Sequence, residues 1–234
     1  HAGFDTEYTY NMGGLRTREA HPDRGVTSFT YDNAGRMTKK KTSNLEASQA
    51  IDYTYHYDRL TQIKYPQNPL QDVEYTYSLG RISEQRDAVG IQRFVYGNQG
   101  ELVEQMSAMA VAGKTSYWFK TQWNYDSWGR VRSITYPDDE QVSYSYDQAG
   151  QLKSVSSFIP GVSAHAVVSD IRYNDYGERE QITYGNGTKT DYSYDTRRRL
   201  ADLSFNFTGF QQTKQYGYDA LSNILDIQSI TSTS

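Results

Sequence analysis

The chain has 234 residues, a formal net charge of −4 and no cysteine. The lack of cysteine excludes disulfides and cysteine-zinc sites. The slight negative charge offers no basic footprint for nucleic acid, and no run of 18 apolar residues is present to form a membrane-spanning helix. The mean hydropathy of −0.81 would suit disorder, but 22 tyrosines, 8 phenylalanines and 3 tryptophans argue for a fold, because disordered chains are poor in aromatic residues.

One motif recurs in chain order: an aromatic residue, any residue, Tyr, Asp, two further residues, Gly, Arg and an aliphatic residue. Its copies are anchored at Tyr10, Tyr31, Tyr55, Tyr77, Tyr96, Tyr125, Tyr146, Tyr173, Tyr194 and Tyr218. The anchors span 208 residues in nine intervals, about 23 residues each, which is a period typical of repeat arrays. The residues expected to act as structural anchors are Tyr31, Asp32, Gly35, Tyr96, Gly100, Tyr125, Asp126, Gly129, Tyr146, Asp147, Gly150, Tyr194, Asp195, Tyr218 and Asp219.

Each copy predicts a β-hairpin. Aromatic residues alternate with Thr or Ser before the turn, which is the period of a strand with one aromatic face. Asp at the first and Gly at the fourth turn position favour a type I turn with a left-handed glycine and a G1 bulge. We therefore expect positive φ at Gly35, Gly100, Gly129 and Gly150. Four copies are expected to differ in turn geometry. Three have Asp58, Arg198 or Ser222 near the glycine position, and the fourth has Ser78 after Tyr77.

The return strands carry aliphatic residues three positions apart, such as Val131 and Ile134. A regular strand would place such a pair on opposite faces, so the spacing predicts a bulge that returns both to one face. Two strands in each of ten units predict about twenty strands in a curved or spiralling antiparallel sheet. The anchor tyrosine rings are expected to form a ladder along one face. Residues 1–234 are interpreted as a single array, a fragment of a longer one.

Two long intervals interrupt the period, near residues 106–113 and 159–168. Both are interpreted as insertions, either long hairpin tips or short covering elements, and any helix is expected to be confined to them.

The copies around Tyr31, Tyr125 and Tyr146 resemble the YD repeats of the RHS family, and the resemblance extends over residues 1 to about 228. It implies a large hollow β-shell, as in RHS toxins, shell-forming Tc toxin subunits and teneurins, with an unfolded C-terminal toxin enclosed in the bacterial members. The Asp-Pro-x-Gly-Leu self-cleavage motif of that family does not occur here.

Few residues suggest chemistry. The histidines are scattered without ligand spacing, and no catalytic or nucleotide-binding fingerprint is present. The acidic run Asp138-Asp139-Glu140 could bind calcium, supply paired carboxylates for glycoside hydrolysis, or form a solvated loop. The run Arg197-Arg198-Arg199 could bind an anionic glycan or nucleic acid, or form a solvated tip. Trp128 lies in a turn and is the candidate ligand contact. We predict no catalytic residue, no metal and no cofactor.

The expected function is structural: a shell segment of a secreted or cell-surface protein that encloses or displays a C-terminal toxin or effector. Its partners would be neighbouring repeats and an enclosed polypeptide, with no nucleic acid and no membrane span. The residues His1-Ala2-Gly3-Phe4 do not resemble a signal peptide, so an export signal would lie outside this chain. The alternatives are a module that binds carbohydrate or protein through tyrosine-lined faces and, third, an enzyme.

Overall fold

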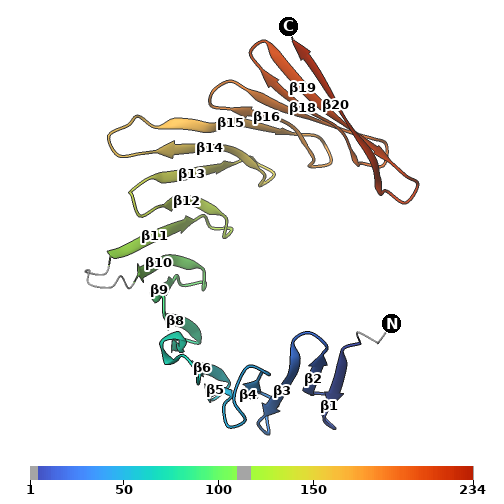
Figure 1. Cartoon of the computed structure of the whole chain (residues 1–234). Coiled ribbons are helices and arrows are strands. Elements are labelled where there is room, and N and C mark those ends of the chain that lie inside the picture. Colours follow the sequence, from blue (N-terminus) through green and yellow to red (C-terminus); the bar gives the residue numbers. More distant parts are fainter. Residues whose placement is uncertain (1–4, 110–116, 234) are drawn as a thin grey trace. The chain divides into compact units, whose positions relative to one another are not determined.

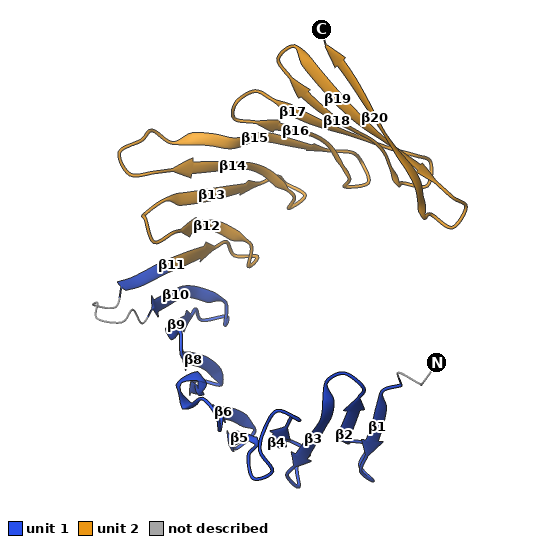
Figure 2. Ribbon diagram, in the orientation of Figure 1, with its two compact units in different colours: residues 1–120 blue, residues 121–234 orange. Residues whose placement is uncertain are grey.

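The computed structural model describes residues 5–109 and 117–233, and nearly all of them lie in or between antiparallel strands (Figure 1). The chain divides into two compact units, residues 1–120 and residues 121–234 (Figure 2). Consecutive strands pair with each other from β1 to β10 and again from β11 to β20. The all-β fold of consecutive antiparallel hairpins is therefore confirmed.

Unit 1 is a meander of short strands. Its elements are β1 (Glu7–Tyr10), β2 (Arg16–His21), β3 (Gly25–Tyr31), β4 (Met37–Lys41), β5 (Ile51–His56), β6 (Arg59–Lys64), the 3₁₀ turn η1 (Pro69–Gln71), β7 (Val73–Ser78), β8 (Arg81–Arg86), β9 (Gly90–Tyr96), β10 (Leu102–Met109) and the start of β11 (Tyr117–Tyr125). Each of β1 to β9 is antiparallel to its successor.

Unit 2 continues the same pattern with longer arms. Its further strands are β12 (Val131–Thr135), β13 (Gln141–Tyr146), β14 (Leu152–Phe158), β15 (His165–Tyr173), β16 (Arg179–Tyr184), β17 (Lys189–Tyr194), β18 (Leu200–Phe207), β19 (Phe210–Tyr218) and β20 (Ile224–Thr233). Strand directions rotate progressively from β12 to β20 (Figure 1), which is the twist expected of a sheet of this kind.

The predicted bulge is present. Tyr125 faces Val131 across the hairpin, whereas Asn124 faces Ser133, so Arg132 is the extra residue on the return strand. Ile134 then faces Trp123. Val131 and Ile134 consequently lie on the same face as the two aromatic residues, and the strand bends at the bulge.

The sheet has no conventional core. Among the described residues, the buried hydrophobic side chains are Ala108 and Ile182, and no large side chain is fully buried. The chain exposes 16025 Å², whereas a compact protein of its mass exposes about 11,000 Å². Stability must therefore come from contacts between neighbouring strands and neighbouring hairpins.

Pairing between consecutive hairpins stops short of the tyrosine-aspartate turns. β12 and β13 pair from Thr135↔Gln141 to Ser133↔Ser143, and β16 and β17 pair from Thr183↔Lys189 to Gln181↔Asp191. No register pair continues from there toward the turns. Neighbouring hairpins thus part as they approach these tips, and the gap has to be bridged by side chains.

The two expected insertions are long hairpin arms. Residues 106–109 complete β10, residues 159–164 form a turn, and residues 165–168 begin β15, while residues 110–113 lie outside the described part of the chain. The expectation that helix is confined to these insertions is wrong, because η1 lies between β6 and β7. Pro69 is its first helical residue, where a fixed φ and a missing N–H are tolerated.

Candidate functional site: a ladder of linked hairpin tips

The repeated turn is held by its aspartate. In the turn after Tyr31, the Gly35 N–H donates to the Asp32 carbonyl at 3.0 Å, and the Asp32 N–H donates to the Arg36 carbonyl at 2.9 Å. The Asp32 carboxylate accepts the backbone N–H groups of Ala34 and Arg36, each at 2.9 Å. The most frequent carboxylate of the repeat is therefore fully engaged inside its own turn.

An arginine completes three of these turns. Arg36, Arg130 and Arg199 each form a two-nitrogen contact with the aspartate four residues earlier, with Nη2 to Oδ2 distances of 2.7, 2.6 and 2.7 Å. Such a two-pronged pair fixes the orientation of the guanidinium. Each of these three arginines is thereby aimed along the row of tips.

The anchor tyrosines bridge the gap between hairpins. The hydroxyls of eight anchors donate to a backbone carbonyl of the preceding hairpin, at the return-strand residue that faces that hairpin's own anchor. The pairs are Tyr31 to Arg16, Tyr55 to Met37, Tyr77 to Leu60, Tyr96 to Ile82, Tyr146 to Val131, Tyr173 to Leu152, Tyr194 to Arg179 and Tyr218 to Leu200, at 2.8–3.0 Å. These carbonyls lie beyond the end of the backbone ladder, so the phenol replaces a strand-to-strand hydrogen bond.

The oriented arginines make a second link to the next hairpin. The Arg36, Arg130 and Arg199 guanidiniums lie 5.0, 4.2 and 4.4 Å from the ring centroids of Tyr55, Tyr146 and Tyr218. Arg130 also approaches the next turn so closely that a Cβ on Gly150 would lie 3.1 Å from its Nη1. Cation–π contacts at exposed sites contribute about 0.5–1 kcal/mol each.

The glycine prediction is confirmed, because φ is 79° at Gly35, 87° at Gly100, 76° at Gly129 and 85° at Gly150. The anchor rings of the predicted ladder do not stack directly on one another. Among the described residues, the ring pairs are His56 with Tyr57 and Phe207 with Phe210, and neither joins two anchors. Neighbouring anchors are connected instead through hydroxyl-to-carbonyl bonds and interposed guanidiniums.

Turns that lack the glycine differ less than expected. Arg198 and Ser222 adopt the same left-handed conformation, with φ of 64° and 69°, and their N–H groups donate to Asp195 and Asp219 as the glycines do elsewhere. The expectation of altered geometry is wrong at these two turns, because the surrounding hydrogen bonds impose the conformation. It is right for the shorter turns at Tyr57–Asp58 and Leu79–Gly80, which hold two residues between paired positions.

One turn carries other residues at both key positions. Gly97 stands where other copies have Asp, and Glu101 stands where they have Arg. The Glu101 carboxylate accepts the Gln99 N–H at 3.0 Å, which is the bond that the turn aspartate makes elsewhere. A Cβ on Gly97 would collide with Glu101 Oε1. Glu101 therefore substitutes for the missing aspartate from the other side of the turn.

Four of the turn aspartates have a lowered pKa. The pKa of Asp32 is lowered first by the side-chain hydrogen bond from Arg36, and that of Asp195 by the backbone and side-chain hydrogen bonds from Arg199. At Asp126 burial acts to raise the pKa, but hydrogen bonds from Arg130 outweigh it and lower the net value. The pKa of Asp219 is lowered by hydrogen bonds from Asn223. These groups are ionised structural acceptors at neutral pH.

The candidate ligand residues do not converge. Trp128 is 70% exposed and lies against the Arg130 guanidinium, 4.6 Å from its ring centroid. In the acidic loop, Glu140 accepts a hydrogen bond from the Ser157 hydroxyl at 2.5 Å. No cluster of three or more acidic or histidine side chains suited to a metal ion occurs in residues 5–109 and 117–233. In the same ranges, no helix is long and apolar enough to cross a membrane. Ligand contact by Trp128 stays a prediction.

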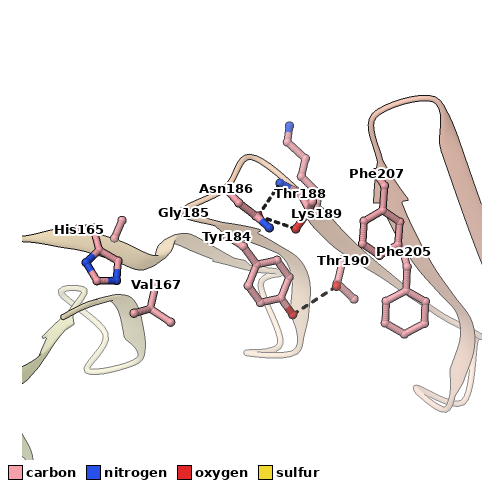
Figure 3. Close-up of a pocket in the computed structure, with 11 residues that line it drawn as sticks. His165, Val167, Tyr184, Gly185, Asn186, Thr188, Lys189, Thr190, Phe205 and Phe207 are labelled. Atoms are coloured by element: carbon pink, nitrogen blue, oxygen red, sulfur yellow. Dashed lines mark hydrogen bonds between the residues drawn. The ribbon is translucent and has the colours of Figure 1, made fainter.

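A shallow depression of about 690 Å³ lies where the short β16–β17 turn sits between two longer arms (Figure 3). The rings of Tyr184, Phe205 and Phe207 lie on the same side of the sheet as Thr190, whose hydroxyl donates to the Tyr184 oxygen at 3.4 Å. Lys189 points to the other side. The lining is mostly uncharged and apolar, and it presents no arrangement of catalytic groups.

Together these features define a class: an antiparallel β-hairpin repeat protein whose units are joined through tyrosine and arginine side chains at their tips. Residues 125–158 match the family model described as RHS Repeat. The resemblance to the RHS/YD-repeat family is thereby confirmed. No curated protein sequence matches the chain.

Several solved structures share this fold. The crystal structure of TcdB2-TccC3 matches with a TM-score of 0.85 at 18% identity, over 98% of this chain and 13% of that one. TcdB2-TccC3-Cdc42 matches with a TM-score of 0.84, and the Photorhabdus luminescens Tc holotoxin pore with 0.83, both at 18% identity, over 96% of this chain and 12% of theirs. The chain thus spans about an eighth of the proteins whose fold it shares.

Proposed function

We propose that the chain is a structural wall segment of an RHS-type shell in a secreted or cell-surface protein, and that the wall encloses a polypeptide cargo. The observation that carries the proposal is the repeated bridge from each anchor hydroxyl to the preceding hairpin. Eight such bonds are made at equivalent positions. The repeated residues are used to join hairpins into sheet.

The single-layer sheet also fits a wall. With so few buried side chains, the chain offers two broad faces, one rich in aromatic and aliphatic residues and one rich in Ser, Thr and charged residues. The matched structures are toxin complexes, which supports enclosure of a polypeptide as the purpose of the wall. A carbohydrate-binding role has no comparable support, because the carboxylate in the hollow beside Trp128, that of Asp126, is already engaged by the N–H groups of its own turn and by Arg130.

Limited proteolysis of the full-length protein that contains these residues tests the enclosure. We expect the wild-type cargo polypeptide to resist a protease that digests it readily once the wall is opened by Tyr146→Ala combined with Tyr173→Ala. The matched control is Tyr57→Ala, since Tyr57 is an 80% exposed turn residue. Equal digestion of cargo in the wild type, the double variant and the control would contradict enclosure.

A further inference from the structure

One rule recurs along the row of tips. A return-strand arginine of the earlier hairpin lies over the next anchor tyrosine and against the next turn glycine at three interfaces, those of Arg59, Arg81 and Arg130. The guanidinium comes from the earlier hairpin, and the glycine leaves room for it.

The interface between the β15–β16 hairpin and the β17–β18 hairpin breaks this rule at both positions. Glu178 stands where the return-strand arginine is expected, and Arg198 stands where the next turn glycine is expected. Arg198 reaches backward: its Nε donates to Glu178 Oε1 at 2.7 Å, its Nη2 donates to the Tyr176 carbonyl at 3.2 Å, and its guanidinium lies 4.7 Å from the Tyr176 ring centroid. A guanidinium again joins the two tips, but the later hairpin supplies it.

The backbone of Arg198 supports a specific role. Its φ of 64° is a conformation that side-chain-bearing residues adopt rarely and at a cost. Such a conformation persists where surrounding contacts compensate for it. At Arg198 the hydrogen bonds of its own turn compensate, as they do at Ser222, and the ion pair and the carbonyl bond to the neighbouring hairpin are contacts that Arg198 has in addition.

We infer that Glu178 and Arg198 form an interlock that makes these two hairpins selective for each other as neighbours. If the β17–β18 tip were to stack on a hairpin that carries the usual return-strand arginine, Arg198 would meet a second guanidinium. If a turn with the usual glycine were to stack on the β15–β16 hairpin, Glu178 would lack its cation. Repulsion of wrong partners and attraction of the right one together give specificity, which a chain of near-identical hairpins needs to stack in order. The inference goes beyond the proposed function, since it holds whether or not the wall encloses a cargo.

A mutant cycle in the full chain tests the interlock, with amide hydrogen exchange at Tyr176 and Gly177 as the readout. These two N–H groups are bonded within the Asn174 turn at 3.0 and 2.9 Å, and neither residue is altered. We expect Glu178→Arg and Arg198→Gly each to speed exchange at least fivefold. The double variant gives this interface the arginine and glycine found at the Arg59, Arg81 and Arg130 interfaces, so its exchange should return to within twofold of the wild type.

The control is Glu180→Arg, the same charge change two residues along the same strand, which should leave exchange unchanged. Should Glu178→Arg fail to fold, Arg198→Gln offers a milder test, because it removes the charge and keeps a donor for the Tyr176 carbonyl. Two results would overturn the interlock. One is an exchange rate in the double variant that equals the product of the two single effects. The other is an exchange rate that neither Arg198→Gly nor Arg198→Gln changes.

Discussion

At the residue scale, the anchor hydroxyl makes the hydrogen bond between neighbouring hairpins where backbone pairing between them has ended. Tyr146 donates to the Val131 carbonyl at 2.8 Å, and its ring is half-buried. In Tyr146→Phe the ring stays and the carbonyl loses its donor, so we expect a loss of about 0.5–1.5 kcal/mol, the usual net value of a hydrogen bond. Urea denaturation measures it. Tyr176→Phe, at a tip that is 71% exposed, is the control and should change stability by no more than about 0.5 kcal/mol.

Substitutions at two turn glycines can distinguish the stability lost to backbone strain from the stability lost to steric crowding. No atom lies within 4 Å of a Cβ built on Gly129, whereas a Cβ on Gly100 would collide with the Arg81 guanidinium. We expect Gly129→Ala to lose about 1–2 kcal/mol from the left-handed backbone alone, and Gly129→Val to lose more. Gly100→Ala should lose more than Gly129→Ala because Arg81 must also move. Equal losses by chemical denaturation at the two positions would show that the arginine does not pack on the next turn.

At the element scale, the turn is a unit built around an ionised carboxylate. The pKa values of Asp32, Asp126, Asp195 and Asp219 are lowered in the folded chain. Because the folded pKa lies below the unfolded value of about 3.9, their stabilisation is present above about pH 4 and is lost as pH falls through the folded pKa values.

We therefore expect the urea midpoint to be nearly constant from pH 7 to pH 5 and to fall steeply below about pH 4. Asp126→Asn combined with Asp195→Asn should lower the midpoint at pH 7 and make the acid decline shallower. An acid decline of the same steepness in this variant would show that other groups cause it.

In the turn of Gly97 and Glu101, we expect substitutions at the two positions to compensate for each other. Gly97→Asp alone would bring a second carboxylate into the space that Glu101 Oε1 occupies, and Glu101→Arg alone would remove the acceptor for the Gln99 N–H. Each single change should destabilise, while the double change rebuilds the Asp-Arg turn of Asp126 and Arg130. Thermal unfolding of the wild type, the two single variants and the double variant measures the coupling. Additive losses of stability in the double variant would show that Glu101 does not take the place of the turn aspartate.

The sequence predicted the parts of each hairpin that depend on nearby residues. The left-handed glycines and the bulge between Val131 and Ile134 follow from local spacing, and both are present. The Tyr146-to-Val131 bond could not be predicted, because it depends on how far two hairpins separate beyond their last backbone pair. The backward reach of Arg198 was hidden for the same reason, although glutamate at the usual arginine position was a visible signal.

At the scale of the whole molecule, each hairpin depends on its neighbours. With Ala108 and Ile182 as the buried hydrophobic residues of the described part of the chain, no central core can compensate for a broken link. Stability in such an array is close to a sum of unit and neighbour terms. The residues that make the wall should therefore be the same residues that keep the chain folded, and residues that act only as ligand contacts should not.

Thermal unfolding of Tyr146→Ala beside Trp128→Ala tests this claim most directly. Tyr146 bridges two hairpins, while Trp128 is 70% exposed at a tip. We expect Tyr146→Ala to lose about 1–3 kcal/mol, less than the 3–5 kcal/mol typical of a fully buried aromatic residue. Trp128→Ala, like Asp138→Ala and Asp139→Ala, should melt close to the wild type and leave a glycan array as blank as the wild type does. If Tyr146→Ala melts like the wild type, or if Trp128→Ala abolishes a robust glycan signal, the wall account is contradicted and the binding-module alternative takes its place.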